Sequence, residues 1–338
     1  MRKLTILVLG LAMGACNNSS QPTTQHQATA SADSVLYSDI IRPITDSLQQ
    51  FPQNHALYYR RALLLFNTHP DMAQKDFEQA AKLDSANTDY WAGAGEAALV
   101  AGNHQTAAHL FSRALQTAPN YPYLQYKLAT AMVENKQYTS ADSLADLLAK
   151  SGEGADQAFY LKARIAEDHK DTVSTVRYLT QAIAVAGDHP EYDALMELAD
   201  LLSVQKQKDA VQYYVQAWKL DSTNAEPLYF AGRFQERMAQ QEAAIASYRK
   251  SIISDPNFEA SYMALGDIYR NHKNWKEAYT FYNLAAKAAP TDALAYYQRA
   301  LCQENLGKKE MALEDYIKAS SFKKDFTEAK AAIKRLSK

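Results

Sequence analysis

The chain has 338 residues, and its 36 Lys and Arg against 38 Asp and Glu give a formal net charge of −2. This near-balance argues against a strongly basic nucleic-acid binder and against an acidic solvating tail. Only 11 Gly and 10 Pro disfavour an all-β chain full of tight turns, and two distant cysteines, Cys16 and Cys302, exclude a disulfide scaffold and a multi-cysteine zinc site. The composition predicts a mostly helical protein, with 22 Tyr as its one unusual count.

The first sixteen residues have the three parts of a secretory signal: a basic start, an apolar run over residues 4–13, and small residues before Cys16. The run is too short for a retained membrane helix. Its end resembles the lipobox of bacterial lipoproteins, although Met13 stands where Leu is usual. The resemblance implies that residues 1–15 are a signal peptide and that Cys16 carries lipid, including palmitate. An ordinary secretory signal with an incidental cysteine is the alternative.

Two short segments follow the signal. Residues 16–33 are mostly Asn, Ser, Gln, Thr and Ala, and such a segment cannot offset the entropy of folding, so it predicts a flexible tether. Residues 34–53 predict an N-terminal helical segment. Because proline lacks an amide donor, Pro43 predicts a kink there or a split into two short helices.

A 34-residue period organises the rest of the chain. Alanines recur at this spacing at Ala210, Ala244, Ala278 and Ala312. Tyrosines recur at Tyr214, Tyr248, Tyr282 and Tyr316. Small residues stand twelve places before three of the alanines, at Gly232, Gly266 and Ala300. Small residues on one helix let a second helix approach closely, and an aromatic residue fills the remaining gap, so the tyrosine series is predicted to be core.

These places resemble the tetratricopeptide repeat (TPR) family. Residues 88–121 show the resemblance best, with the family's signature residues at Trp91, Gly95, Ala107, Phe111, Ala114 and Pro119. The resemblance implies an all-α fold: a right-handed superhelical solenoid of about eight helix-turn-helix repeats with a C-terminal capping helix. Capping is needed because an end repeat otherwise leaves an apolar face in water.

The register places the solenoid at residues 54–326 and the capping helix at 327–338. The predicted units are 54–87, 88–121, 122–155, 156–190, 191–224, 225–258, 259–292 and 293–326. The fourth unit carries one extra residue. Gly102 and Gly307 lie in the short turns within units.

No catalytic constellation is recognisable. The P-loop, dinucleotide-binding, nucleophile-elbow and zinc-protease motifs are all absent from the sequence. Cys302, in the middle of a predicted helix, is expected to be a small buried hydrophobe. The sequence therefore predicts a protein that is not an enzyme and that takes no cofactor, no metal and no nucleic acid.

The resemblance also implies that the first helix of each unit lines the concave face, where family members hold partners. The inner-facing places of these helices give the candidate partner-binding residues, with acidic neighbours such as Glu134, Glu167 and Glu236. The candidates are Tyr126, Tyr160, Arg164, Tyr229, Arg233, Arg237, Asp267, Arg270, Asn271, Tyr297 and Glu304. Because Tyr and Arg combine apolar area with directional hydrogen bonds, the stripe of Tyr229, Arg233 and Arg237 with the facing Arg270 is the strongest candidate.

Chaperone-adaptor repeats of the family hold a C-terminal carboxylate with a Lys, Asn and Arg set on two first helices. The ninth places of units two to eight read Glu96, Thr130, Arg164, Ala199, Arg233, Asp267 and Leu301. The required Asn is missing, so that particular activity is not expected.

These observations predict a non-catalytic, lipid-anchored interaction scaffold on the periplasmic side of a bacterial envelope membrane. It would bind a peptide or protein partner in the concave groove and assist the assembly of an envelope complex. The alternative is an exported glycan- or small-ligand-binding protein, in which the tyrosine-lined face stacks sugars. The sequence provides tyrosines for such a face but no concentrated tryptophan platform.

Overall fold

A computed structural model describes residues 32–337, and the regular elements within them are nineteen α-helices. Their bounds are α1 (Ala32–Leu36), α2 (Arg42–Gln50), α3 (His55–Leu65), α4 (Pro70–Leu83), α5 (Thr88–Val100), α6 (His104–Thr117), α7 (Pro122–Glu134), α8 (Tyr138–Ser151), α9 (Ala155–Asp168), α10 (Thr172–Ala186), α11 (Tyr192–Val204), α12 (Ala210–Leu220), α13 (Glu226–Arg237), α14 (Gln241–Ser254), α15 (Glu259–Asn271), α16 (Trp275–Ala288), α17 (Ala293–Asn305), α18 (Lys309–Phe322) and α19 (Thr327–Leu336). The predicted signal peptide and Cys16 lie outside the described residues, as does most of the tether, whose last two residues belong to α1.

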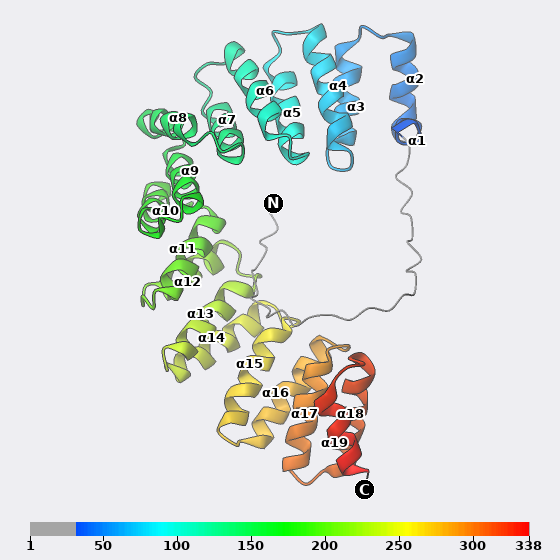
Figure 1. Cartoon of the computed structure of the whole chain (residues 1–338), viewed down its shortest axis with the longest axis vertical. Coiled ribbons are helices and arrows are strands. Elements are labelled where there is room, and N and C mark those ends of the chain that lie inside the picture. Colours follow the sequence, from blue (N-terminus) through cyan, green and yellow to red (C-terminus); the bar gives the residue numbers. More distant parts are fainter. Residues whose placement is uncertain (1–31, 338) are drawn as a thin grey trace, which may run out of the picture.

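The helices pack mainly on their neighbours in sequence, and together they form an open arc (Figure 1). Eight helical hairpins run from α3–α4 to α17–α18, and α19 packs against α18 at the C-terminal end. The predicted all-α solenoid with a C-terminal helix is confirmed. The N-terminal segment splits into α1 and α2 as expected, with Pro43 in the first turn of α2. No helix within residues 32–337 is long and apolar enough to cross a lipid bilayer.

Each hairpin in the C-terminal half is held by an aromatic side chain of the second helix against a small residue of the first. A Cβ atom built on Gly232 would lie 2.6 Å from ring atom Cε1 of Tyr248, and one on Gly266 would lie 2.5 Å from Cε1 of Tyr282. Such distances are too short for carbon atoms, so the rings need the glycines at these places. Tyr248 and Tyr282 are fully buried, as predicted for the tyrosine series.

A left-handed residue closes the first helix of seven hairpins. These residues are Gly102, Lys136, Lys170, Lys206, Ala239, Lys273 and Gly307. Each follows the previous one by 34 residues, except that Lys206 follows Lys170 by 36 and Ala239 follows Lys206 by 33. The fourth unit therefore has two extra residues, in the loop after α10, and the fifth lacks one. The predicted boundary after residue 190 is displaced by one residue, which puts Asp200 at the ninth place instead of the fully buried Ala199.

Cys302 lies on α17 and is fully buried, packed with Tyr282 and Ala278. Burial raises the pKa of its thiol to about 12. The thiol is therefore neutral at physiological pH and behaves as a small apolar side chain.

The left-handed conformation of Ala239, with φ of 57°, predicts a stabilising substitution. An alanine in this region is strained by about 1 kcal/mol, whereas glycine adopts it freely, so we expect Ala239→Gly to raise the free energy of unfolding by about 0.5–1 kcal/mol. Urea denaturation followed by circular dichroism measures it. The control is Ala246→Gly at an exposed place within α14, which should lower stability by about 1 kcal/mol. Loss of stability in both variants would contradict the prediction.

A second prediction concerns Glu259, at the start of α15. Its pKa is raised to about 7, first by burial and then by the neighbouring Asp292. Because this folded-state pKa exceeds the unfolded value of about 4.3, the group lowers stability as pH rises between these two values. We expect Glu259→Gln to raise the melting temperature by about 1–2 °C at pH 8, since solvent screens the half-buried carboxyl, and to leave it unchanged near pH 4. Thermal melts of Glu226→Gln, an exposed glutamate in the first turn of α13, should show no such gain.

Candidate protein-binding face

The first helices of the hairpins form the inner layer of the arc. Figure 1 shows α9, α11 and α13 on the inner side, with α10, α12 and α14 outside them. The sequence-predicted residues come from α7, α9, α13, α15 and α17, so the hairpin stacking aligns them along this layer.

A cleft of about 370 Å³ opens between α13 and α15. Its lining residues are Arg233, Glu236, Arg237, Ala264, Asp267, Arg270 and Asn271. Five of these were predicted from the sequence as partner-binding residues. The structure therefore brings the two halves of the strongest candidate, the α13 stripe and Arg270 of α15, to one cleft.

The three arginines of this cleft differ in what they contact. Arg270 pairs with Asp267 at 3.2 Å and donates to Gln298 at 3.2 Å, but its buried Nε has no hydrogen-bond partner within the described chain. Arg233 donates to the hydroxyl of Tyr229 at 2.9 Å, and Arg237 donates to a serine hydroxyl, that of Ser203. Neither Arg233 nor Arg237 forms an ion pair with any carboxylate of residues 32–337. Two exposed guanidinium groups therefore enter the cleft without a directly paired carboxylate. Against the effect of burial, however, the charge of Glu236 helps to raise the pKa of Arg233, and the charge of Arg237 acts against the pKa of Asp200, which burial raises.

The two carboxylates of the cleft accept hydrogen bonds from tyrosines whose rings are buried in the core. The hydroxyl of Tyr248 donates to Oε2 of Glu236 at 2.6 Å, and that of Tyr282 donates to Oδ1 of Asp267 at 2.7 Å. Burial first, and then the hydrogen bond, raises the pKa of Tyr248, so its hydroxyl stays protonated and donates. Tyr248 thus extends from α14 to α13 and orients the carboxylate of Glu236 on the inner layer.

The same contact recurs in two further hairpins. Tyr214 donates to Asp200, and Tyr316 donates to Glu304 at 3.0 Å. Sequence reasoning treated these tyrosines as core residues only, and it missed Asp200 because the register was one residue off. The left-handed turn residues give the correct register of the repeats. Only two of the seven are Gly, so the sequence shows this signal only in part.

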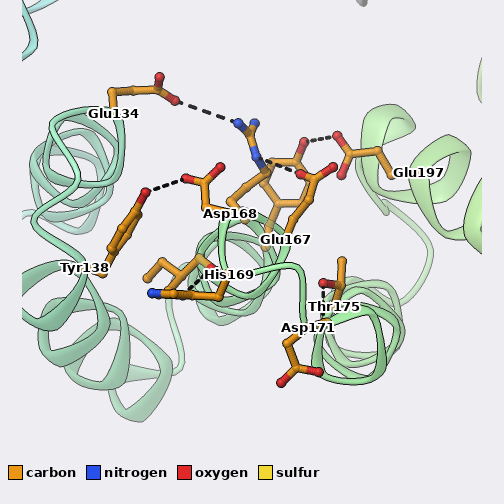
Figure 2. Close-up of polar contacts among 11 residues, drawn as sticks. Glu134, Tyr138, Glu167, Asp168, His169, Asp171, Thr175 and Glu197 are labelled. Atoms are coloured by element: carbon orange, nitrogen blue, oxygen red, sulfur yellow. Dashed lines mark hydrogen bonds and ion pairs between the residues drawn. The ribbon is translucent and has the colours of Figure 1, made fainter. Parts of the chain in front are cut away.

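A second polar cluster lies on α9 and its neighbours (Figure 2). Tyr160 donates to Oε1 of Glu197 at 2.9 Å, and Arg164 lies 3.9 Å from Glu134 and 3.5 Å from Glu167. Figure 2 shows the carboxylates of Glu134, Glu167 and Glu197 directed toward one another from three helices. Burial raises the pKa of Glu197, although the Tyr160 hydroxyl and Arg164 act against this. Unlike the α13–α15 cleft, this cluster surrounds its arginine with negative charge.

The remaining predicted residues are in other surroundings. Tyr126 is half-buried on α7. Tyr297 packs its ring against Phe326 at 4.8 Å between centroids, and Glu304 forms an ion pair with Arg335 of α19. The C-terminal helix and Phe326, which directly precedes it, thus contact both predicted residues of the last unit, whereas Asn271 stays exposed at the α13–α15 cleft.

Models of the tetratricopeptide repeat match the chain at residues 59–122 and 235–293, at 98–165, and at 293–326. Together these matches span more than half of the 338 residues. They include α13 in part and α15 and α17 in full, the helices that carry most of the predicted residues.

Curated relatives align over part of their length. The BBSome complex member bbs-4 of Caenorhabditis elegans is 23% identical over 215 residues, which are 61% of this chain and 46% of that protein. Protein FlbA of Caulobacter vibrioides is 26% identical over 213 residues, which are 62% of this chain and 35% of that protein. The chain thus spans less than half of either relative.

Solved structures with a similar arrangement include MamA and YrrB. MamA is 18% identical and covers 52% of this chain and 95% of its own, with a TM-score of 0.44. YrrB, described as a TPR protein with an unusual peptide-binding site, is 18% identical and covers 65% of this chain and 96% of its own, with a TM-score of 0.35.

Proposed function

The chain belongs to the tetratricopeptide repeat family, and from this premise we propose that it is a non-catalytic scaffold that holds an acidic segment of a protein partner in the α13–α15 cleft. The repeats support a role in protein–protein interaction. The observation that carries the finer proposal is the pair Arg233 and Arg237, which enter the cleft without a carboxylate partner among the described residues.

Charge complementarity favours an acidic occupant. Arg233, Arg237 and Arg270 outnumber the two carboxylates of the cleft, so the cleft carries a net positive charge. Guanidinium groups bind carboxylates in a bidentate geometry and are enriched where proteins recognise acidic groups. An aspartate or glutamate side chain of a partner would provide the ion pairs that Arg233 and Arg237 lack among residues 32–337.

The tyrosines of the inner layer favour a protein partner over the glycan alternative. Tyr160 uses its hydroxyl on Glu197, and the ring of Tyr229 packs edge-on against Phe230 and Phe258 with centroid distances of 5.5 Å. Tyr297 packs on Phe326. The rings of Tyr229 and Tyr297 are thus already packed on other aromatic rings, and the hydroxyl of Tyr160 is already bonded, which leaves less of these side chains for a sugar.

The proposal includes a location. The basic start, the apolar run and Cys16 at its end support a lipid anchor on the periplasmic side of a bacterial envelope membrane. Two or more acyl chains on one residue give stable anchoring, whereas one chain gives only marginal binding. A scaffold held there would gather its partner at the membrane and assist the assembly of an envelope complex.

Reversing the charges of Arg233 and Arg237 tests the cleft. We expect Arg233→Glu combined with Arg237→Glu to weaken binding of a fluorescein-labelled octaglutamate peptide by at least about tenfold, since two attractive contacts become repulsive. Fluorescence anisotropy at physiological salt measures the affinity.

The matched control is Lys276→Glu combined with Lys287→Glu. These exposed lysines lie on α16, in the second helix of a hairpin, and their reversal changes the net charge equally. The control should retain most of the affinity. Equal loss in both double variants would show that the net charge of the protein, and not the cleft, determines binding. Undiminished binding after reversal of Arg233 and Arg237 would reject the cleft as the binding site.

The anchor has its own test. Cys16→Ser should move the full-length protein from the membrane fraction to the soluble fraction when it is expressed in a bacterial host, because the residue that would carry the lipid is lost. Fractionation followed by immunoblotting measures this. Cys302→Ser is the control and should stay with the membrane, since Cys302 is buried in α17. Continued membrane attachment of Cys16→Ser would show that another feature anchors the protein.

A further inference from the structure

Two hairpins of the chain carry the same arginine and glutamate at the same places of their first helix. In α9 these are Arg164 and Glu167, and in α13 they are Arg233 and Glu236, three residues apart in both cases. In α9 the two side chains form an ion pair with 3.5 Å between Nε and Oε2. In α13 no such pair is formed within the described structure. The same two residue types at the same spacing therefore behave differently.

The core residue behind them differs between the two hairpins. The second helix α10 has Leu179 where α14 has Tyr248, and both side chains are fully buried. Leu179 has no hydrogen-bonding group, so Glu167 turns to the arginine on its own helix. Tyr248 donates to Glu236 at 2.6 Å and holds that carboxylate, while Arg233 turns to the hydroxyl of Tyr229.

We propose that Tyr248 is a positioning residue that withdraws Glu236 from Arg233 and so keeps this arginine available to an acidic partner. The inference rests on the proposed function of the α13–α15 cleft and explains how Arg233 stays free of Glu236 there. A glutamate three residues from an arginine on the same helix can pair with it. It therefore competes with the carboxylate of a partner for that arginine. A buried hydroxyl that hydrogen-bonds the glutamate removes this competition without removing the charge.

The last hairpin provides a comparison within the chain. Tyr316 donates to Glu304 at the place equivalent to Tyr248 and Glu236, but there the first helix has Leu301 in place of the arginine. Glu304 pairs instead with Arg335 of α19. Loss of the Tyr316 hydroxyl therefore frees no competitor for an arginine of the cleft.

The test is a double-mutant cycle on the full chain with the octaglutamate peptide as probe. Tyr248→Phe keeps the buried ring and removes only the hydroxyl, and we expect it to weaken binding about fivefold as Glu236 pairs with Arg233. Adding Glu236→Gln removes the competitor and should restore the affinity. Glu236→Gln alone should bind at least as tightly as the unmodified chain, and Tyr316→Phe should bind as the unmodified chain does.

Three outcomes overturn the inference. One is unchanged affinity in Tyr248→Phe while the Arg233 and Arg237 reversal abolishes binding. Another is a loss in Tyr248→Phe that Glu236→Gln does not restore, because a purely structural role of the hydroxyl would give that result. The third comes from a crystal structure of Tyr248→Phe, which needs no probe: we expect Arg233 and Glu236 to form an ion pair as in α9, and continued separation rejects the inference.

If the reversal of Arg233 and Arg237 leaves octaglutamate binding intact, the proposed function fails. The crystal structure of Tyr248→Phe still decides whether the tyrosine positions Glu236. The two failures are therefore distinguishable.

Discussion

The close contact between a small residue on one helix and an aromatic ring on the next is the constraint on which the rest of this structure depends. Tyr248 can lie fully buried only because Gly232 leaves space for its ring, and the same holds for Tyr282 and Gly266. Interior side chains pack as densely as organic crystals, so a methyl group at either glycine would displace the ring or the helix. In the hairpins that have the ring, the contact sets the distance between the two helices. In α10 the buried Leu179 takes the place of the ring, and repetition of the hairpin builds the arc.

The same contact gives the core a polar function. A tyrosine that passes this close to the first helix places its hydroxyl at the inner surface, where it meets a carboxylate of that helix. Tyr248 and Tyr282 do so with Glu236 and Asp267 across the α13–α15 cleft. A buried hydroxyl needs a partner, and a surface carboxylate provides one, so the requirement of the core also decides how the surface charge is oriented.

Charge on the inner layer is therefore local. Around α9 the single Arg164 lies among Glu134, Glu167 and the Tyr160–Glu197 pair, whereas the α13–α15 cleft has three arginines for two carboxylates. The net charge of −2 averages over both regions and describes neither. Recognition at this face depends on which carboxylates the neighbouring helices and the core already hold.

The sequence by itself determined the repeat, the hairpins and the identity of the core tyrosines, because small and aromatic residues recur in phase every 34 residues at the places that resemble the tetratricopeptide repeat. Through helical spacing it also placed Arg233 and Arg237 on one face, and through the resemblance to the repeat family it placed Arg270 opposite them. It did not determine the register of the fifth unit, where two residues are inserted before α11 and one is lost after it, so that Asp200 was passed over. Nor could it show that Glu167 pairs with its arginine while Glu236 does not. That difference is set by the residue behind each glutamate, Leu179 or Tyr248, and only the packing of the second helix against the first brings that residue within hydrogen-bonding distance.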